Sequence, residues 1–222
     1  MKKQLIITFT AAASLLSLAV KADDNSNNWS GLYGGVNLGH ASGTSHAEKL
    51  TGGEGAFSHI SGGLGGAQIG YNFQADHIVY GVEADIQKSD ITGINLFNAD
   101  LRSSQKIDWF GTARGRLGYS FGNFLLYVTG GLAIADVKAN TTGSSLSYVF
   151  NSNNRQTQYG WTAGTGLEWA VDKNWILDAQ YLRISLNKED FHFISTSPSA
   201  ISSTNQNNSD FNVFKIGINY KF

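Results

Sequence analysis

Charged side chains of both signs alternate with apolar ones along the chain, and their chemistry would matter most if a fold gathered them. Eight of them share the polar face of their segments: Glu83, Asp85, Asp108, Arg114, Arg116, Glu168, Asp178 and Lys215. In an enclosed space such a set could line a path for ions, or its members could neutralise one another as ion pairs. A charge taken out of water is costly unless it is paired, so the enclosing structure decides between these roles.

The histidines are the residues that could bind haem iron or a metal ion, and there are five: His40, His46, His59, His77 and His192. Imidazole suits iron and zinc, but no two of them have the spacing of a metal site. His192 lies near Asp190 and Ser195, which are residue types of a hydrolytic triad. No motif of known catalytic mechanism accompanies them. The sequence therefore predicts a protein that is not an enzyme and has neither a cofactor nor a metal site.

Eight segments of alternating apolar and polar residues hold these side chains. They cover residues 29–40, 65–74, 77–88, 106–121, 124–138, 157–170, 175–186 and 210–222. In the third segment, Ile78, Tyr80 and Val82 fall on one face, and Glu83 and Asp85 fall on the other. A period of two residues is typical of β-strands whose faces meet different surroundings. Both faces of the fifth segment are apolar, and the set assigned outward there is Leu126, Val128, Leu132 and Ile134.

The connections between the segments strictly alternate between short and long. Three are tight turns, at residues 75–76, 122–123 and 171–174. Four are long and rich in Ser, Thr, Asn and Gly, at residues 41–64, 89–105, 139–156 and 187–209. Short turns at one rim and long loops at the other are the layout of a transmembrane β-barrel.

The tryptophans support the barrel over a soluble β-sandwich. All five fall near predicted strand ends: Trp29, Trp109, Trp161, Trp169 and Trp175. Aromatic residues at both edges form the interfacial girdles of a barrel in lipid, whereas a sandwich would concentrate them in the middle of its core. We therefore predict an all-β fold, an eight-stranded antiparallel up-and-down transmembrane β-barrel with short periplasmic turns and long extracellular loops.

The beginning of the chain has the three parts of a secretory signal peptide. Residues 1–3 are a basic start, residues 5–20 are an apolar run, and Ala22 ends a cleavage site of small side chains. The run is shorter than the about 20 residues of a spanning helix. We predict a cleaved signal peptide over residues 1–22 and one barrel domain over residues 23–222.

The composition excludes several other classes of protein. The chain has 17 acidic and 16 basic residues with no basic face, which argues against nucleic acid as a partner. It has no cysteine, so there is neither a disulfide framework nor a thiolate metal site. No second apolar stretch reaches spanning length, which excludes a helical membrane protein. The 26 glycines beside one proline suit strands with close backbone approach.

Several motifs carry a resemblance to a known family. The end of the chain resembles the signal by which the barrel-assembly machinery recognises its clients, and it matches at Lys215, Gly217, Tyr220 and Phe222. Residues 161–182 and three shorter stretches are similar to the small outer-membrane protein β-barrel family, in its porin-like and surface-antigen branch. The shorter stretches are Trp-Ser-Gly-Leu-Tyr-Gly-Gly at 29–35, Asp-Trp-Phe-Gly-Thr-Ala-Arg-Gly-Arg-Leu-Gly-Tyr at 108–119 and Tyr-Val-Thr-Gly-Gly-Leu-Ala at 127–133.

The resemblance implies a bacterial outer-membrane barrel of eight strands, and some relatives are described as porins, haemin-binding proteins or adhesive surface proteins. A barrel of this size is just wide enough for side chains to fill it, which favours ion pairs over an open pore. We therefore expect a surface protein with a structural, adhesive or host-interaction role, both chain ends being periplasmic. Expected partners are outer-membrane lipid, the barrel-assembly machinery, and host surface molecules or haemin. A narrow porin for small solutes and a haemin-binding receptor remain the alternatives.

Overall fold

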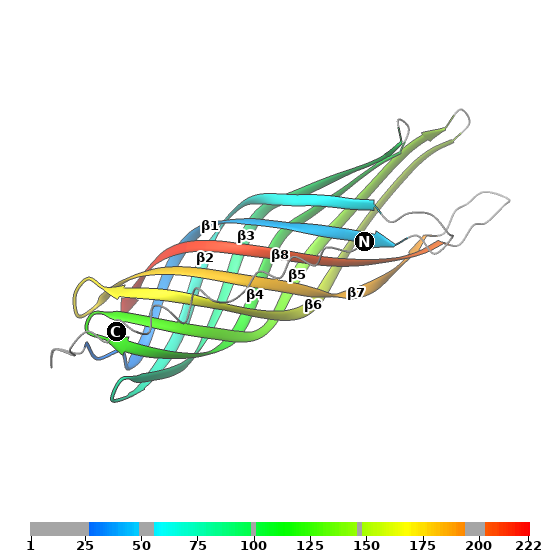
Figure 1. The fold of residues 1–222 in the computed structure, drawn as a ribbon. Coiled ribbons are helices and arrows are strands. Elements are labelled where there is room, and N and C mark those ends of the chain that lie inside the picture. Colours follow the sequence, from blue (N-terminus) through cyan, green and yellow to red (C-terminus); the bar gives the residue numbers. More distant parts are fainter. Residues whose placement is uncertain (1–26, 49–55, 99–100, 146–147, 194–202) are drawn as a thin grey trace, which may run out of the picture.

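The computed structural model is a single closed barrel of eight antiparallel strands (Figure 1). In chain order the strands are β1 (Gly31–Glu48), β2 (Ala56–Ala75), β3 (Ile78–Asn98), β4 (Leu101–Phe121), β5 (Phe124–Ser145), β6 (Tyr148–Ala170), β7 (Trp175–Phe193) and β8 (Ser203–Lys221). Each strand pairs with its neighbour in the sequence, and β1 pairs with β8 to close the ring. The predicted fold, an eight-stranded antiparallel barrel, is confirmed.

The structure describes residues 27–48, 56–98, 101–145, 148–193 and 203–222. The expected signal peptide, residues 1–22, lies outside these ranges. Within them, no helix has the length and hydropathy needed to cross a membrane.

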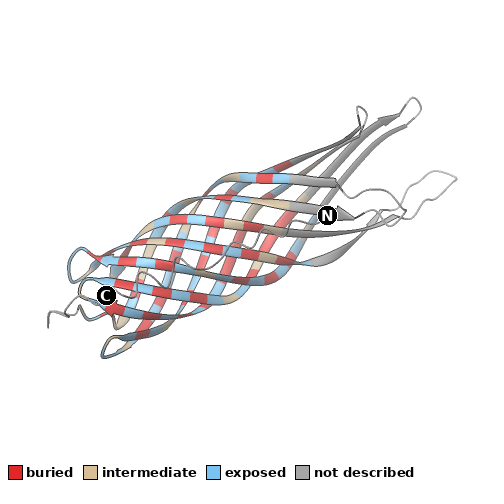
Figure 2. Cartoon of the chain, viewed as in Figure 1, coloured by how far each residue is buried: buried red, intermediate tan, exposed pale blue. Residues whose placement is uncertain are grey.

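Each strand has one face inside the barrel and one face outside, as Figure 2 shows by the alternation of buried and exposed residues. The outside carries large apolar side chains on all eight strands, among them Val36, Ile69, Val82, Leu132 and Ile216, each more than half exposed. Exposed apolar surface of this extent is incompatible with a protein surrounded by water. It forms the wall that faces lipid, and the polar residues lie inside.

The outward face of β5 agrees with the sequence assignment. Leu126, Val128 and Leu132 are exposed, and Ile134 is half-buried on the same outer face. The inward face carries Leu125 and Tyr127, which are buried. Two apolar faces occur on this strand because the interior of the barrel is itself partly apolar.

The strands are much longer than the sequence pattern predicted. At the end with the tight turns, which we call the turn rim, their limits agree with the prediction to within two residues. At the opposite end, the loop rim, the strands continue through most of the residues expected as long loops. For example, β1 extends from the predicted end at His40 to Glu48, and β6 begins at Tyr148 instead of Thr157. The hairpins β3–β4 and β5–β6 reach furthest at this rim (Figure 1).

This extension corrects the four predicted long loops. The Ser, Thr and Asn residues there do not follow the alternation of the wall, because beyond the lipid the outer face of a strand needs no apolar side chain. Backbone hydrogen bonds between strands continue nonetheless, as in the pairing of Thr141 with Ser152. The alternation of apolar and polar residues therefore marks only the lipid-embedded part of each strand, and it does not predict the part beyond the lipid.

The three tight turns form from residues that tolerate their backbone geometry. Asp76 and Gly122 both have positive φ angles, 53° and 61°, which Asp and Gly accept more readily than most residues. In the β6–β7 turn, Asp172 accepts hydrogen bonds from the backbone N–H groups of Trp175 and Asn174, both at 2.8 Å. These bonds, that from Trp175 foremost, hold the pKa of the Asp172 carboxyl below its usual range.

A β-bulge in β4 overturns the predicted placement of Asp108. The pairing of β4 with β5 shifts register between Ile107 and Trp109, and an extra residue in one strand reverses which face the following side chains occupy. Asp108 consequently lies outside the lumen, where it pairs with Lys138. Ile107, expected on the outer face, is buried inside instead.

Trp29 also departs from its predicted place in the outer aromatic girdle. Its side chain is 1% exposed and lies within the turn rim, where it packs with the buried side chains Val79, Leu125, Tyr127, Ala170 and Ile176. The indole nitrogen donates to the Ser120 hydroxyl at 2.8 Å. Gly31 has a φ of 130°, a conformation open to glycine, which lets the residues before β1 turn into the barrel mouth.

Candidate functional site

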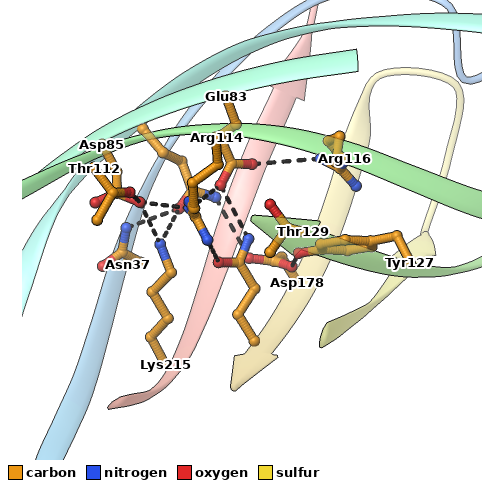
Figure 3. Close-up of polar contacts among 12 residues, drawn as sticks. Asn37, Glu83, Asp85, Thr112, Arg114, Arg116, Tyr127, Thr129, Asp178 and Lys215 are labelled. Atoms are coloured by element: carbon orange, nitrogen blue, oxygen red, sulfur yellow. Dashed lines mark hydrogen bonds and ion pairs between the residues drawn. The ribbon is translucent and has the colours of Figure 1, made fainter. Parts of the chain in front are cut away.

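The charged lumen is built around Arg114 of β4, which bridges two carboxylates of the neighbouring strand β3 (Figure 3). Its Nη2 donates to Glu83 and, at 2.5 Å, to Asp85. Its Nη1 donates to the side-chain oxygen of Gln180 at 3.1 Å. Glu83 and Arg114 are direct cross-strand partners in the register. The side chain is completely buried, and its two terminal nitrogens are bonded to these groups in place of water.

Arg116 occupies the next inward position of β4 and is held between two tyrosines. Its guanidinium lies 3.9 Å from the ring centroid of Tyr127 and 5.5 Å from that of Tyr33, within the range of cation–π attraction. Its Nη1 also donates to the Tyr33 hydroxyl at 2.7 Å, and its Nη2 donates to Glu168 at 2.7 Å. The Tyr33 hydroxyl in turn donates to Glu83 at 2.7 Å. Arg116 thus connects the carboxylates of β3 and β6 across the lumen.

Each tyrosine lies over a glycine on an adjacent strand. A Cβ atom at Gly70 would collide with the ring and hydroxyl of Tyr33, and one at Gly166 would collide in the same way with Tyr127. Only a residue without a side chain leaves room for these rings. The two pairs come from β1–β2 and β5–β6, so the barrel repeats this arrangement four strands apart.

A third cation, Lys215 of β8, completes the set. Its Nζ lies 3.2 Å from an oxygen of Asp85 and 3.4 Å from the side-chain oxygen of Gln68. Asp178 accepts a hydrogen bond from the Tyr127 hydroxyl at 3.0 Å. Four carboxylates and three cations therefore share this layer, and neutral hydroxyl and amide groups make further contacts with the carboxylates.

Apolar layers lie on both sides of the charged layer. Towards the turn rim lies the group around Trp29 described above. Towards the loop rim lies a larger buried cluster, which includes Ile60, Ile91, Phe110, Ile184 and Phe211. The rings of Phe110 and Phe211 meet edge to face with centroids 5.8 Å apart. Along the described part of the lumen, buried apolar clusters thus lie on both sides of the charged layer, and the loop-rim side also buries Gln87 and Gln158.

The structure gathers seven of the eight predicted lumen charges in one buried layer, and Asp108 is the exception. It also adds contributors that the sequence analysis missed, above all Tyr33 and Tyr127. The inner position of Tyr33 follows from the alternation of β1, whereas Tyr127 lies on the strand whose two faces are both apolar. The alternation of residues along these strands does not predict that a glycine on the adjacent strand faces each tyrosine ring.

The predicted assembly-signal residues all lie on or beside β8, but they differ in surroundings. Lys215 is buried in the lumen, and Gly217 lies opposite Asn37 of β1 in the register. Tyr220 and Phe222 are on the outer face, where their rings meet at 5.3 Å between centroids. The backbone N–H of Phe222 donates to the carbonyl of Leu32 at 3.0 Å, so the last residue is tied to the first strand.

The other four predicted interfacial tryptophans lie on the outer face. Trp169 and Trp175 are at the turn rim, where Trp169 stacks on Phe124 and Trp175 meets Tyr220. Trp109 and Trp161 lie on the part of the outer wall nearer the loop rim. Together with Tyr and Phe side chains they border the apolar wall at both ends.

The histidines do not converge where the structure describes them. His40 and His59 are exposed near the loop rim, and His77 lies in the β2–β3 turn at the other end. The side chains of His46, Asp190 and His192 and the whole of Ser195 lie outside the described residues. In the described part of the chain, no three His, Cys, Asp or Glu side chains form a group that could hold a metal ion.

Comparison with known proteins agrees with this architecture. The family model for the outer membrane protein β-barrel domain matches residues 8–222. The 31 kDa outer-membrane immunogenic protein of Brucella melitensis is 34% identical over 87% of this chain and 84% of its own length. The 22 kDa outer membrane protein of Rhizobium leguminosarum bv. viciae is 35% identical over 76% of this chain and 70% of its own length.

Solved structures share the fold at low sequence identity. The outer membrane protein OprG of Pseudomonas aeruginosa has a TM-score of 0.50 at 16% identity, covering 90% of this chain and 99% of OprG. The outer membrane protease OmpT of Escherichia coli has a TM-score of 0.51 at 10% identity, covering 91% of this chain and all of OmpT. Given its closed barrel, its lipid-facing wall and the family match over nearly its whole length, this chain belongs to the outer membrane protein β-barrel family.

Proposed function

We propose that this protein is a closed surface barrel, whose role is to hold its loop-rim strands and their connections outside the cell for contact with other molecules, including host surfaces. The proposal rests on the two buried apolar clusters of the described lumen. Solute passage requires a continuous polar path, but Trp29 and Phe110 belong to apolar layers on either side of the charged layer. A narrow porin is accordingly the weaker alternative.

The length of the strands supports the same role. A strand needs about ten residues to cross the outer membrane, whereas the strands of this barrel have 18 to 23 residues. The excess lies at the loop rim, where it builds a β-structured wall beyond the lipid. The Brucella relative is described as an immunogenic outer-membrane protein, and immunogenicity is consistent with parts that are exposed on the cell.

The unmodified protein should not conduct ions in a planar lipid bilayer. Insertion should leave the current at the level of the bare membrane, because the apolar layers exclude hydrated ions. The Trp29→Ala variant should remain closed as well, since the charged layer and the cluster around Phe110 are still in place. A general porin measured in the same bilayer is the positive control. A stable conductance that scales with salt concentration would reject the closed barrel and favour the porin.

We further propose that the loop rim is extracellular and that both chain ends are periplasmic. Epitope tags inserted near Thr51, Asn98 or Asn151 should then bind antibody on intact cells. Tags near Asp76 or Asn123 should bind only after the outer membrane has been opened. Surface labelling of the second group alone would show that the topology is reversed.

We also propose that the aromatic end of β8 is read by the barrel-assembly machinery. Deleting Phe222 should lower the amount of folded barrel in the outer membrane while leaving export across the inner membrane unchanged. Phe222 is 75% exposed, so little packing energy is lost with its side chain. Heat-modifiable migration of membrane fractions measures folding, and a Phe222→Tyr variant, which keeps the terminal ring, is the control. Normal levels of the shortened barrel would contradict this role.

A further inference from the structure

The outer surface of the barrel carries a row of cations on adjacent strands, towards the loop-rim edge of the lipid-facing wall. Lys106 of β4 is paired in the register with Lys138 of β5, and Lys138 is paired with Arg155 of β6. Their side chains are 48%, 40% and 65% exposed. Lys88, on β3, is exposed on the same outer face, directly opposite Trp109. Four adjacent strands therefore each present a basic side chain outward.

Like charges directly opposite one another on neighbouring strands destabilise a sheet, so the row requires anions. Three aspartates supply part of them: Asp90 is 3.1 Å from Lys106, Asp108 is 2.5 Å from Lys138, and Asp136 binds Arg155. Within the described residues Lys88 has no ion pair, so the cations outnumber the aspartates here by one.

The aspartates bind only some of the N–H groups of these basic side chains. Arg155 donates to Asp136 from Nε and Nη2, and its Nη1 makes no bond to the described residues. Asp90 is 78% exposed, so its pair with Lys106 is easily exchanged for another anion. An anion with several acceptor oxygens could therefore bind to two or three of these cations at once.

The aromatic residues next to the row identify the surroundings of that anion. On the same strands, the outer wall carries Trp109 directly opposite Lys88, and Tyr159 and Trp161 below Arg155 on β6; these aromatics border the apolar wall. Such aromatics mark the boundary between lipid chains and headgroups. With the loop rim outside the cell, as proposed above, the cations lie at the level of the headgroups of the outer leaflet.

The opposite side of the barrel lacks this pattern. On β7, β8, β1 and β2 the outward residues towards the loop rim include Ser42, Ser61 and Asn212. One ion pair accompanies them, Arg183 with Asp210 at 3.0 Å. Among the side chains that the structure describes, the basic surface therefore lies on the β3–β6 side, and their electrostatic attraction to anions will be directional.

We propose that the surface formed by Lys88, Lys106, Lys138 and Arg155 binds the phosphate groups of a phosphorylated lipid of the outer leaflet. Lysines contribute point charges and Arg155 a planar guanidinium, and both are standard ligands of phosphate. The bound lipid anchors the β3–β6 side of the barrel in the headgroup layer. This inference concerns the outer wall, so it does not depend on whether the lumen conducts.

The test uses the folded full-length barrel in neutral detergent micelles doped with lipid A, a bisphosphorylated glucosamine lipid, or with its dephosphorylated form. Native mass spectrometry counts the lipid molecules that stay bound. Lipid A should bind, and the dephosphorylated lipid should bind at least about tenfold more weakly. Combined replacement of Lys88, Lys106 and Lys138 by glutamine should weaken binding of lipid A by about tenfold or more, as expected for the loss of three basic side chains near an anionic surface.

A matched pair of single variants provides the control. Lys138→Gln and Arg183→Gln each remove one partly exposed cation that pairs with one aspartate, on opposite sides of the barrel. Lys138→Gln should weaken binding of lipid A, whereas Arg183→Gln should not, and Lys138→Arg should retain it. If the triple variant does not fold, these single variants and a salt titration of the unmodified protein still test whether the basic surface binds the phosphate groups. Salt should release lipid A and leave binding of the dephosphorylated lipid unchanged.

Three outcomes would overturn the proposal. The first is equal retention of the phosphorylated and dephosphorylated lipids. The second is equal weakening by Lys138→Gln and Arg183→Gln, which would indicate diffuse attraction. The third is displacement of lipid A by inorganic phosphate at similar concentration, which would assign the surface to free phosphate and not to a lipid.

Discussion

Replacing Arg114 by alanine should lower the free energy of unfolding by about 3–5 kcal/mol, the usual cost of removing one partner from a buried ion pair. Arg114 bridges Glu83 and Asp85 and also donates to Gln180, so its loss leaves two carboxylates short of a cation. Glu83→Ala should cost less, because Arg114 then keeps Asp85. Urea titration of the barrel in lipid vesicles, followed by tryptophan fluorescence, measures both changes.

A double-mutant cycle distinguishes pairing from general loss of packing. The Arg114→Ala/Glu83→Ala variant should cost clearly less than the sum of the single variants, since the second substitution removes a charge already left unpaired. The exposed pair Arg183–Asp210 is the control, because surface ion pairs contribute at most about 1 kcal/mol. Strict additivity at Glu83 and Arg114 would mean that their contact contributes nothing to stability.

The sequence predicted which face of most strands lies inside, because a strand in lipid must place apolar side chains outward and can place polar ones only inward. Val82 and Glu83 are neighbours in the chain, yet one faces hydrocarbon and the other the lumen, and only alternation satisfies both. The rule failed at Asp108 because a bulge adds one residue without a distinctive sequence. It failed again at the loop rim, because residues there such as Thr141 and Ser152 lie beyond the lipid and need not alternate with apolar residues.

The sequence predicted most of the charged residues that form the buried layer, but fewer of the contacts between them. Cross-strand partners in a hairpin closed by a short turn, such as Gln68 and Asp85 of β2–β3, follow from the length of that turn, which fixes the register. Glu83 and Arg114 lie on β3 and β4, which are joined at the loop rim, so no short turn fixes their pairing. Contacts across the lumen, such as Lys215 with Asp85 or Arg116 with Glu168, depend on the tilt and stagger of the closed barrel. Those quantities emerge only when the last strand meets the first, and no local pattern encodes them.

Gly166→Ala should lower the free energy of unfolding by about 1–3 kcal/mol through overpacking. The added Cβ would collide with the ring and hydroxyl of Tyr127. That ring has no free space to occupy, because Arg116 lies 3.9 Å from its centroid and its hydroxyl donates to Asp178. Moving the ring would therefore disturb an ion-paired guanidinium as well. Urea titration as above measures the loss.

Two comparisons separate this collision from a general effect of replacing glycine in a strand. At Gly63 an added Cβ meets nothing within 4 Å, so Gly63→Ala should be neutral or slightly stabilising through reduced freedom of the unfolded chain. Combining Gly166→Ala with Tyr127→Leu should recover part of the stability that the two single variants lose, because the shorter side chain leaves room for the methyl group. Equal effects at Gly63 and Gly166 would show that backbone propensity, and not the tyrosine above the glycine, explains the result. Gly70 beneath Tyr33 should behave as Gly166 does, since the same ring-over-glycine contact recurs there on the other side of Arg116.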